Sequence, residues 1–352
     1  MAASSVTPVT VLTGFLGSGK TTLLNALVRD PRFAGTAVVV NEWGEAAIDH
    51  ALVREATENV VVLPSGCICC RVAGDLVRAL RELHFQRVDG KIPDFRRVVI
   101  ETTGLADPAP LMTTLIEMPL AAARYSLAGV VATVDAEHGM GALDAHAEAV
   151  KQVAMADRVV VTKCDRARPE AIAALEARVA ALNPGAGVLR SSGADVDPAL
   201  ILETGLYRGE RAPPDAAGWL NAGAYRHAGR PAAGPHDARI ASFVWRAQEP
   251  LPWDDVESAL ETLAEVMGGR ILRLKGLVNV AGEPGPRAVH AVQHTLYPSA
   301  RLAAWPDDDR STRLVFIGRD LDEAPVAAIL ESFLDKASAP WQAPSKARTS
   351  SP

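Results

Sequence analysis

The residues from Gly14 to Thr21, GFLGSGKT, fit the phosphate-loop pattern G-x-x-x-x-G-K-[ST] at every constrained position. A short β-branched run, Val9–Leu12, precedes them, and residues 22–28 after them are apolar at helical spacing. A glycine-rich turn between a strand and a helix directs backbone N–H groups and the helix dipole at a phosphate chain. A turn without a ligand would explain the glycines but not the lysine and threonine that follow. The pattern therefore predicts binding of a nucleoside triphosphate.

Two side chains of this loop have distinct expected roles. Lys20 would reach the β- and γ-phosphates, and the hydroxyl of Thr21 would ligate Mg²⁺. The set expected to contact the nucleotide here is Gly14, Gly17, Ser18, Gly19, Lys20, Thr21 and Thr22.

A second chemical motif, Glu101-Thr102-Thr103-Gly104, ends the strand-like run Val98–Ile100. In phosphate-loop proteins an acidic residue at this place holds Mg²⁺, directly or through water, and the following glycine offers its N–H to the γ-phosphate. Lys20, Thr21 and Glu101 are therefore the candidate catalytic residues, and Gly104 is a further nucleotide contact. The alternative is an ordinary strand end with a solvated glutamate.

A guanine-reading element is indicated by residues 162–165, Thr-Lys-Cys-Asp, after the strand-like run Val159–Val161. It resembles the Asn-Lys-x-Asp element of GTPases, whose aspartate accepts hydrogen bonds from the ring N–H and exocyclic amine of guanine. Adenine has no matching pair of donors, so Asp165 would favour GTP over ATP. Lys163 would pack its aliphatic stem along the base or its loop. Thr162 stands where the usual asparagine would be, which leaves one amide contact open.

Three of the four cysteines are packed into Cys67-Ile68-Cys69-Cys70, after a strand-like run and a Pro-Ser-Gly turn. Clustered cysteines do not form the spread framework that disulfides need, whereas three thiols in one turn can converge on one soft cation. Thiolates favour Zn²⁺ and related late first-row metals over Mg²⁺ or Ca²⁺, and Zn²⁺ and Co²⁺ remain equal alternatives. Cys67, Cys69 and Cys70 are therefore predicted metal ligands, with a fourth tetrahedral position open. A redox dithiol and plain core cysteines are the competing interpretations.

Carboxylates gather in the segment Asn41–Asp49, which follows the strand-like run Ala37–Val40. The segment falls where a nucleotide-sensing switch loop would lie. Its carboxylates could bind Mg²⁺, orient water or donate to a second metal, and a solvated acidic loop is an equally good interpretation. Glu42 is kept as a candidate metal ligand.

Length and composition limit the class of protein. A chain of 352 residues exceeds what one hydrophobic core usually covers, and 48% apolar residues are ample for a buried core. A formal net charge of −6 and a pI near 5.8 argue against a nucleic-acid partner. No apolar stretch is long enough to span a bilayer, and the first residues lack the basic region of a secretory signal. We therefore expect no membrane partner and a cytoplasmic protein.

Apolar runs and helical patterns alternate from Val9 to about Leu202. Continuous apolar runs suit parallel strands buried on both faces, so the pattern predicts a doubly wound α/β domain with ligands at the carboxyl ends of its strands. The predicted strands are Val9–Leu12, Ala37–Val40, Val60–Leu63, Val98–Ile100, Val130–Val134 and Val159–Val161, and Ala171–Leu182 is a predicted helix.

A smaller α+β domain is predicted after a stretch rich in Gly, Pro and Ala. The expected divisions are a flexible N-terminus (1–8), a phosphate-loop domain (9–207), a linker (208–237), the smaller domain (238–337) and a disordered tail (338–352). In the smaller domain the strands expected are Ile240–Trp245, Ile271–Val280, Val289–His294 and Leu314–Ile317, and the helices are Trp253–Met267, stopped by Gly268-Gly269, and Leu321–Leu334.

The order of these motifs resembles the CobW family of GTPases, most specifically in the C-x-C-C element between the phosphate loop and the E-x-x-G strand. Residues 270–276, RILRLKG, and 292–295, VQHT, look like the C-terminal domain of that family. The resemblance implies a GTP-hydrolysing metallochaperone that uses GTP and Mg²⁺ and delivers Zn²⁺ or Co²⁺ to a client metalloprotein. Many relatives carry a histidine-rich stretch near the domain junction, whereas this chain has only His227 and His236 there. Single-ion delivery is thus favoured over metal storage, and the oligomeric state, with a homodimer as one alternative, stays open.

Two other functions compete with a metal-delivering GTPase. One is a non-catalytic zinc-sensing adaptor, in which the nucleotide only stabilises the fold. The other is a phosphate-loop kinase or synthetase that acts on a small molecule. Asp165 and the cysteine cluster argue against the second, and turnover of GTP that is lost in Lys20→Ala would exclude the first.

Overall fold

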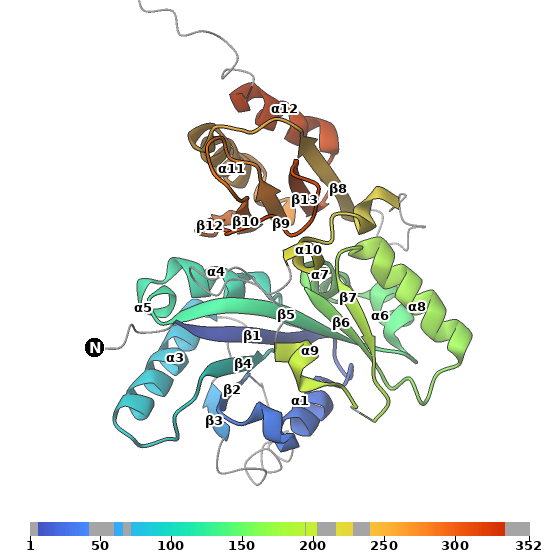
Figure 1. Ribbon diagram of the computed structural model, residues 1–352. Helices are drawn as coiled ribbons and strands as arrows, with labels where there is room; N and C mark the ends of the chain where they lie inside the picture. Colours follow the sequence, from blue (N-terminus) through green and yellow to red (C-terminus); the bar gives the residue numbers. More distant parts are fainter. Residues whose placement is uncertain are drawn as a thin grey trace, which may run out of the picture.

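The computed structural model describes residues 6–41, 60–65, 72–193, 195–202, 216–227 and 240–334. Two sheets organise these residues into an N-terminal and a C-terminal domain (Figure 1). Glu42 and the three clustered cysteines lie outside the described residues.

The N-terminal sheet is parallel throughout, in the order β3-β2-β4-β1-β5-β6-β7. Ten of the eleven residues of its longest strand, Tyr125–Asp135, are buried, as expected where helices cover both faces. The strands are β1 (Thr7–Gly14), β2 (Thr36–Asn41), β3 (Val60–Ser65), β4 (Arg97–Glu101), β5 (Tyr125–Asp135), β6 (Arg158–Thr162) and β7 (Gly187–Arg190).

Helices cover the two faces of this sheet with separate apolar clusters. One cluster joins Leu23 and Leu27 of α1 to Leu202 of α9, and the other joins helices α3, α4, α7 and α8. The helices are α1 (Lys20–Arg29), α3 (Val72–Val88), α4 (Ala109–Glu117), α5 (Pro119–Ala122), α6 (Gly139–Ala145), α7 (Ala147–Met155), α8 (Pro169–Leu182) and α9 (Pro198–Leu202), with a 3-10 helix η1 (Pro31–Phe33).

The C-terminal sheet is antiparallel, in the order β11-β10-β9-β13-β8, with β12 paired to β10. Two helices pack on one of its faces through residues such as Leu260 and Leu330. The elements are β8 (Ile240–Ala247), α11 (Trp253–Met267), β9 (Ile271–Val278), β10 (Arg287–Val292), β11 (Thr295–Leu296), β12 (Ala300–Arg301), β13 (Thr312–Arg319) and α12 (Glu323–Leu334).

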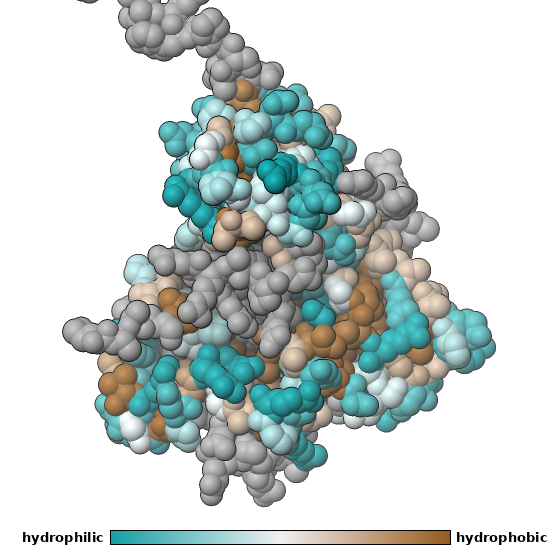
Figure 2. Space-filling view, in the orientation of Figure 1, coloured by the Kyte–Doolittle hydropathy of each residue, from teal (hydrophilic) through white to brown (hydrophobic). Residues whose placement is uncertain are grey.

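The other face of this sheet rests on the N-terminal domain, above α4, α7 and α10 in Figure 1. Apolar contact is continuous across the junction, because Leu277 and Val292 belong to the same cluster as Val153 of α7. Charged groups are also buried there: Asp157, the residue before β6, pairs with Arg273 and Lys275 of β9. In the space-filling view, hydrophilic surface predominates on the C-terminal domain, whereas hydrophobic surface gathers on the N-terminal domain around β6 and β7 (Figure 2).

The predicted fold class is confirmed, with two differences in detail. β7 is an additional short strand at the edge of the parallel sheet, and β11 and β12 are additional in the second sheet. Within 208–237, for which the sequence predicts a linker, residues 216–227 form helix α10 (Ala216–Leu220) and a 3-10 helix η2 (Ala224–His227). Helix α11 ends at Gly268 as predicted. Among the residues described, no helix is long and apolar enough to cross a membrane.

Candidate nucleotide-binding site

The predicted nucleotide residues come from strands that are neighbours in the sheet. β4, β1, β5 and β6 lie side by side and run parallel, so the residues that follow them meet at one edge. This edge gathers the phosphate loop after β1, Glu101 at the end of β4, Asp135 at the end of β5 and the segment Thr162–Asp165 after β6. Ligands of doubly wound sheets bind at this edge.

The backbone of the phosphate loop favours glycine at three positions, of which the pattern fixes Gly14 and Gly19. Gly14, Gly17 and Gly19 all have positive φ, at 142°, 70° and 89°. A Cβ atom on Gly14 would lie 2.3 Å from Oγ1 of Thr133 and 2.8 Å from Oγ of Ser18, so no larger residue fits. Gly19 begins α1 without a side-chain cap, and the first turn of α1 holds no acidic residue. The N–H groups of that turn are thus available to an anion.

Lys20 and Thr21 occupy the first turn of α1. Lys20 is buried, and its Nζ donates hydrogen bonds to the backbone oxygens of Gly14 (2.8 Å) and Phe15 (3.1 Å). The hydroxyl of Thr21 donates to Oε1 of Glu101 at 2.6 Å, although the two residues are 80 positions apart in the chain. Hydroxyl and carboxylate oxygens are the ligands that Mg²⁺ prefers, so this pair fits that cation. Thr22 is exposed.

Buried hydroxyl groups support the loop from the strands beneath it. Ser18 bonds to Thr133 of β5 at 2.7 Å, and Thr102 donates to Thr13 at 2.9 Å. Thr162 donates to the backbone oxygen of Ser18 at 2.7 Å. Thr162 thus contacts the phosphate loop, whereas the sequence pattern places it in the guanine-reading element.

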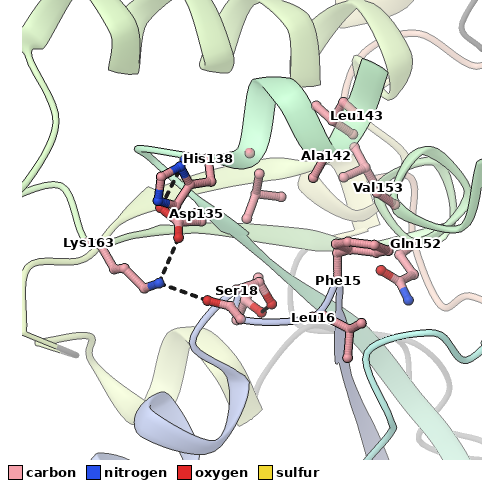
Figure 3. A pocket seen from close by; sticks show the side chains of 15 residues that line it. Phe15, Leu16, Ser18, Asp135, His138, Ala142, Leu143, Gln152, Val153 and Lys163 are labelled. Atoms are coloured by element: carbon pink, nitrogen blue, oxygen red, sulfur yellow. Dashed lines mark hydrogen bonds and ion pairs between the residues drawn. The ribbon is translucent and has the colours of Figure 1, made fainter. Parts of the chain in front are cut away.

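Lys163 bridges the loop and strand β5, as Figure 3 shows. Its Nζ lies 2.6 Å from Oδ2 of Asp135 and donates to the backbone oxygen of Gly17 at 2.8 Å. Burial raises the pKa of Asp135, but hydrogen bonds from Lys163 and from backbone N–H groups outweigh it and hold the pKa below its ordinary value. Lys163 has a φ of 56°, an uncommon conformation for a residue other than glycine. Asp135 is a site residue that the sequence motifs did not indicate.

Asp165 differs from these buried groups because its side chain is 52% exposed. Such an exposed carboxylate is accessible to a base from outside the loop. The segment after β7 lies next to it: the N–H of Cys164 donates to the backbone oxygen of Ser191 at 3.0 Å. The sequence does not predict a role for Ser191, because it does not predict the short strand β7 that comes before it.

The turn after β4 touches the phosphate loop and helix α7. A Cβ atom on Gly104 would lie 2.7 Å from the backbone nitrogen of Leu16, so the turn can approach this closely only as glycine. Gln152 of α7 donates to the backbone oxygens of Gly104 (3.2 Å) and Ala106 (3.0 Å). Sequence motifs gave no signal for Gln152, a polar residue within an apolar helical pattern.

A cavity of about 140 Å³ lies between the phosphate loop and helices α6 and α7 (Figure 3). Its walls include Phe15, Leu143 and Val153, and Lys163 lies at its edge. The ring of Phe15 also stacks on His146, with centroids 4.3 Å apart.

The predicted metal ligands Glu42, Cys67, Cys69 and Cys70 remain a prediction, because they lie outside the described residues. Elsewhere in the described chain, no group of three or more His, Cys, Asp or Glu side chains is placed to hold a metal ion. The fourth cysteine, Cys164, is a free thiol that donates to the backbone oxygen of Val161.

Comparison with known proteins finds relatives along most of the chain. The CobW/HypB/UreG nucleotide-binding domain matches residues 8–190, and the cobalamin synthesis protein cobW C-terminal domain matches residues 240–334. The zinc chaperone YjiA of Escherichia coli is 33% identical over 320 residues, covering 91% of this chain and 96% of its own. The zinc chaperone CobW of Pseudomonas aeruginosa is 32% identical, over 93% and 91% of the two chains. The crystal structure of Zn(II)-bound YjiA GTPase from E. coli matches with a TM-score of 0.69 at 28% identity, covering 93% of this chain and 99% of that one.

Proposed function

This chain belongs to the CobW family of phosphate-loop GTPases, and from that premise we propose that it hydrolyses GTP and delivers a thiophilic divalent metal to a client metalloprotein. Zinc is the metal proposed first, because the relatives YjiA and CobW are named zinc chaperones and YjiA has been crystallised with Zn(II). Cobalt, which accepts the same thiolate ligands, is the alternative cargo.

The observation that carries the GTPase proposal is the 2.6 Å hydrogen bond from Thr21 to Glu101. It joins the ends of two motifs that are distant in sequence, next to a helix N-terminus without a side-chain cap. We assign Thr21 and Glu101 to hold Mg²⁺, which when bound neutralises charge on the phosphate oxygens. Lys20 supplies a second positive charge, and the N–H groups of the glycine-rich loop orient the phosphate chain.

Asp165 is assigned to select the base. Its exposed carboxylate can accept hydrogen bonds from the two donors on guanine, and Lys163, two positions earlier in the chain, is held by Asp135 and Gly17. Asp165→Asn should weaken GTP binding by more than about 1 kcal/mol, or about fivefold, while the weaker affinity for ATP changes little. Equal losses for the two nucleotides would mean that Asp165 does not read the base.

Turnover tests the phosphate-loop assignment. Lys20→Ala should abolish most GTP hydrolysis and leave the fold intact, because the lysine acts on charge that develops during phosphoryl transfer. A matched control is Lys91→Ala, which removes an exposed lysine paired with Asp89. Phosphate release at saturating GTP and Mg²⁺ gives the rates, and near-normal turnover in Lys20→Ala would remove the assignment.

Cys67, Cys69 and Cys70 are assigned to the cargo metal, with Glu42 as a candidate fourth ligand. The topology supports this pairing of distant segments. β2 and β3 are neighbouring parallel strands whose last residues, Asn41 and Ser65, pair in register. Glu42 directly follows Asn41 in the chain, and Cys67 comes two positions after Ser65.

Zinc binding at fixed pH tests the cysteine assignment, since thiolates compete with protons. Cys69→Ser combined with Cys70→Ser should weaken one zinc site by more than the about 10- to 100-fold that loss of an outer-shell partner costs. The matched control is Cys164→Ser, which removes the one cysteine outside the cluster. Unchanged zinc affinity in the double variant would place the metal elsewhere.

A further inference from the structure

Helix α7, together with its N-cap residue, contacts the phosphate loop, the turn after β4 and the C-terminal domain. At its start, the N-cap residue His146 stacks on Phe15 of the phosphate loop with an interplanar angle of 22°. Further along α7, Ala149, Gln152 and Val153 line the cavity that lies between this helix and the loop. This aromatic contact is thus the first of three connections made by the helix.

The middle of α7 holds the turn that begins at Gly104. Lys151 pairs with Asp107 at 2.5 Å, and Gln152 donates to two backbone oxygens of the same turn. Gln152 is 1% exposed, and both neighbours are acceptors, so its NH₂ group must face them. Its Oε1 then has no hydrogen-bond partner among the described residues. The orientation of this side chain is therefore fixed by the turn.

The end of α7 is capped partly by the C-terminal domain. Asn183 donates to the backbone oxygens of Val153, Ala154 and Ala156. The oxygen between them, that of Met155, accepts from the guanidinium of Arg273 in β9. A helix leaves its last carbonyl groups without intrahelical partners, and a cation is favoured at that end. Arg273 thus supplies a helix cap across the domain junction.

The same guanidinium bonds to Asp157, two residues beyond α7. Both side chains are at most 3% exposed. The C-terminal domain therefore binds the end of a helix that holds the turn expected to face the γ-phosphate. A second contact acts on α4, the helix after that turn, because Thr295 donates to Glu117 at 2.6 Å.

We propose that Gln152 is a positioning residue for GTP hydrolysis and that α7 couples the turn at Gly104 to the C-terminal domain through Arg273. The proposal rests on the GTPase function inferred above. A shift of the turn towards a γ-phosphate must either break both hydrogen bonds to Gln152 or carry α7 with it. The cavity beside α7 leaves room for the helix to move with the turn. The hydrogen bond from Arg273 to the end of α7 then transmits the displacement to β9.

Gln152→Met tests the positioning role, because methionine keeps the length of the side chain and removes both donors. We expect the turn to contact the γ-phosphate, which GDP lacks. The kcat for GTP should therefore fall about 10- to 100-fold, while the Kd for GDP stays within about twofold. The matched control is Gln86→Met on α3, where the amide bonds only to Glu82 on the surface. Unchanged kcat, or equal losses of kcat and GDP affinity, would overturn the positioning role.

Amide hydrogen exchange tests the coupling without any substitution at the junction. The wild-type chain is compared with GDP and with guanosine 5′-(β,γ-imido)triphosphate. Exchange in β9 should differ between the two nucleotides, and in Gln152→Met this difference should vanish while protection of α1 persists. Equal exchange in β9 with α1 protected by both nucleotides would overturn the coupling. Absence of protection in α1 would instead refute nucleotide binding itself, and with it the premise.

Discussion

Asp157→Asn removes the buried negative charge that pairs with two cations at the junction of the domains. Oδ1 of Asp157 lies 2.5 Å from Arg273 and 2.7 Å from Lys275, and Oδ2 accepts from the backbone N–H of Val130 at 2.9 Å. Burial raises the pKa of Asp157, but Arg273 and Lys275 outweigh it and hold the pKa well below its ordinary value. The carboxylate is therefore ionised at neutral pH. Asparagine keeps the shape and an acceptor for Val130, but it removes the charge and places an NH₂ donor against Arg273 and Lys275.

The expected loss of stability follows from the two cations left behind. Removing one partner of a buried ion pair costs about 3–5 kcal/mol. Burial lowers the pKa of Lys275 to about 8 although Asp157 raises it, so without Asp157 this lysine can release its proton at pH 7 at a cost of at most about 1.4 kcal/mol. Arg273 has no such escape, since a guanidinium stays protonated. We therefore expect Asp157→Asn to lower the free energy of unfolding by about 3–5 kcal/mol, with most of the loss due to Arg273.

Urea unfolding at pH 7, followed by both fluorescence and circular dichroism, measures this change and shows whether the transition is cooperative. The matched control is Glu176→Gln, which breaks the ion pair with the 61% exposed side chain of Arg190 and should cost less than about 1 kcal/mol. If Asp157→Asn lowers the free energy of unfolding by less than about 1 kcal/mol with an unchanged m-value, the reasoning is refuted. Water would then have to reach the junction and solvate the two cations.

Three further outcomes are expected. Burial lowers the pKa of Lys275 to about 8, whereas the unfolded chain holds this proton to higher pH. The free energy of unfolding should therefore rise by up to about 3 kcal/mol between pH 8 and 10.5. Unfolding measurements across that range should show no such rise in Lys275→Met. Gly104→Ala places a Cβ 2.7 Å from the backbone nitrogen of Leu16, so steady-state assays should show GTP turnover reduced about tenfold or more with GDP affinity kept; equal losses would contradict the close approach. Thr162→Val removes the hydrogen bond to the oxygen of Ser18 and should weaken GTP and ATP alike by about 1–3 kcal/mol in binding titrations; a loss for GTP alone would place Thr162 at the base.

Apolar patterning is enough to predict most elements of both domains. β1, β2, β4, β5 and β6 are central or covered strands, and their continuous apolar runs mark them in the sequence. β7 has no such apolar run, because it is a four-residue strand at the sheet edge and is exposed at both of its ends. The helices within 216–227 are too short to show a helical period.

The local motifs give candidate phosphate contacts but no signal for the residues that support the loop in the structure. The motif around Lys20 is continuous in sequence, so spacing alone reveals it. Gln152, Asp135 and Arg273 act through contacts between distant segments, and a single sequence does not show which segments meet. Basic residues at alternate positions of the otherwise apolar strand β9 were the one available signal for Arg273.

The chemistry of the junction distinguishes it from an ordinary core. Buried ion pairs give weak net stability, and apolar residues of similar volume often do as well or better. A junction selected only for stability would therefore have no need of Asp157, Arg273 and Lys275. Arg273 instead bonds both to the end of α7 and to Asp157, the residue before β6. That strand leads to Lys163 and Asp165. One charged side chain of the C-terminal domain thus holds both the helix that carries Gln152 and the strand that leads to the segment proposed to read the base. This arrangement suits communication between the domains better than attachment alone.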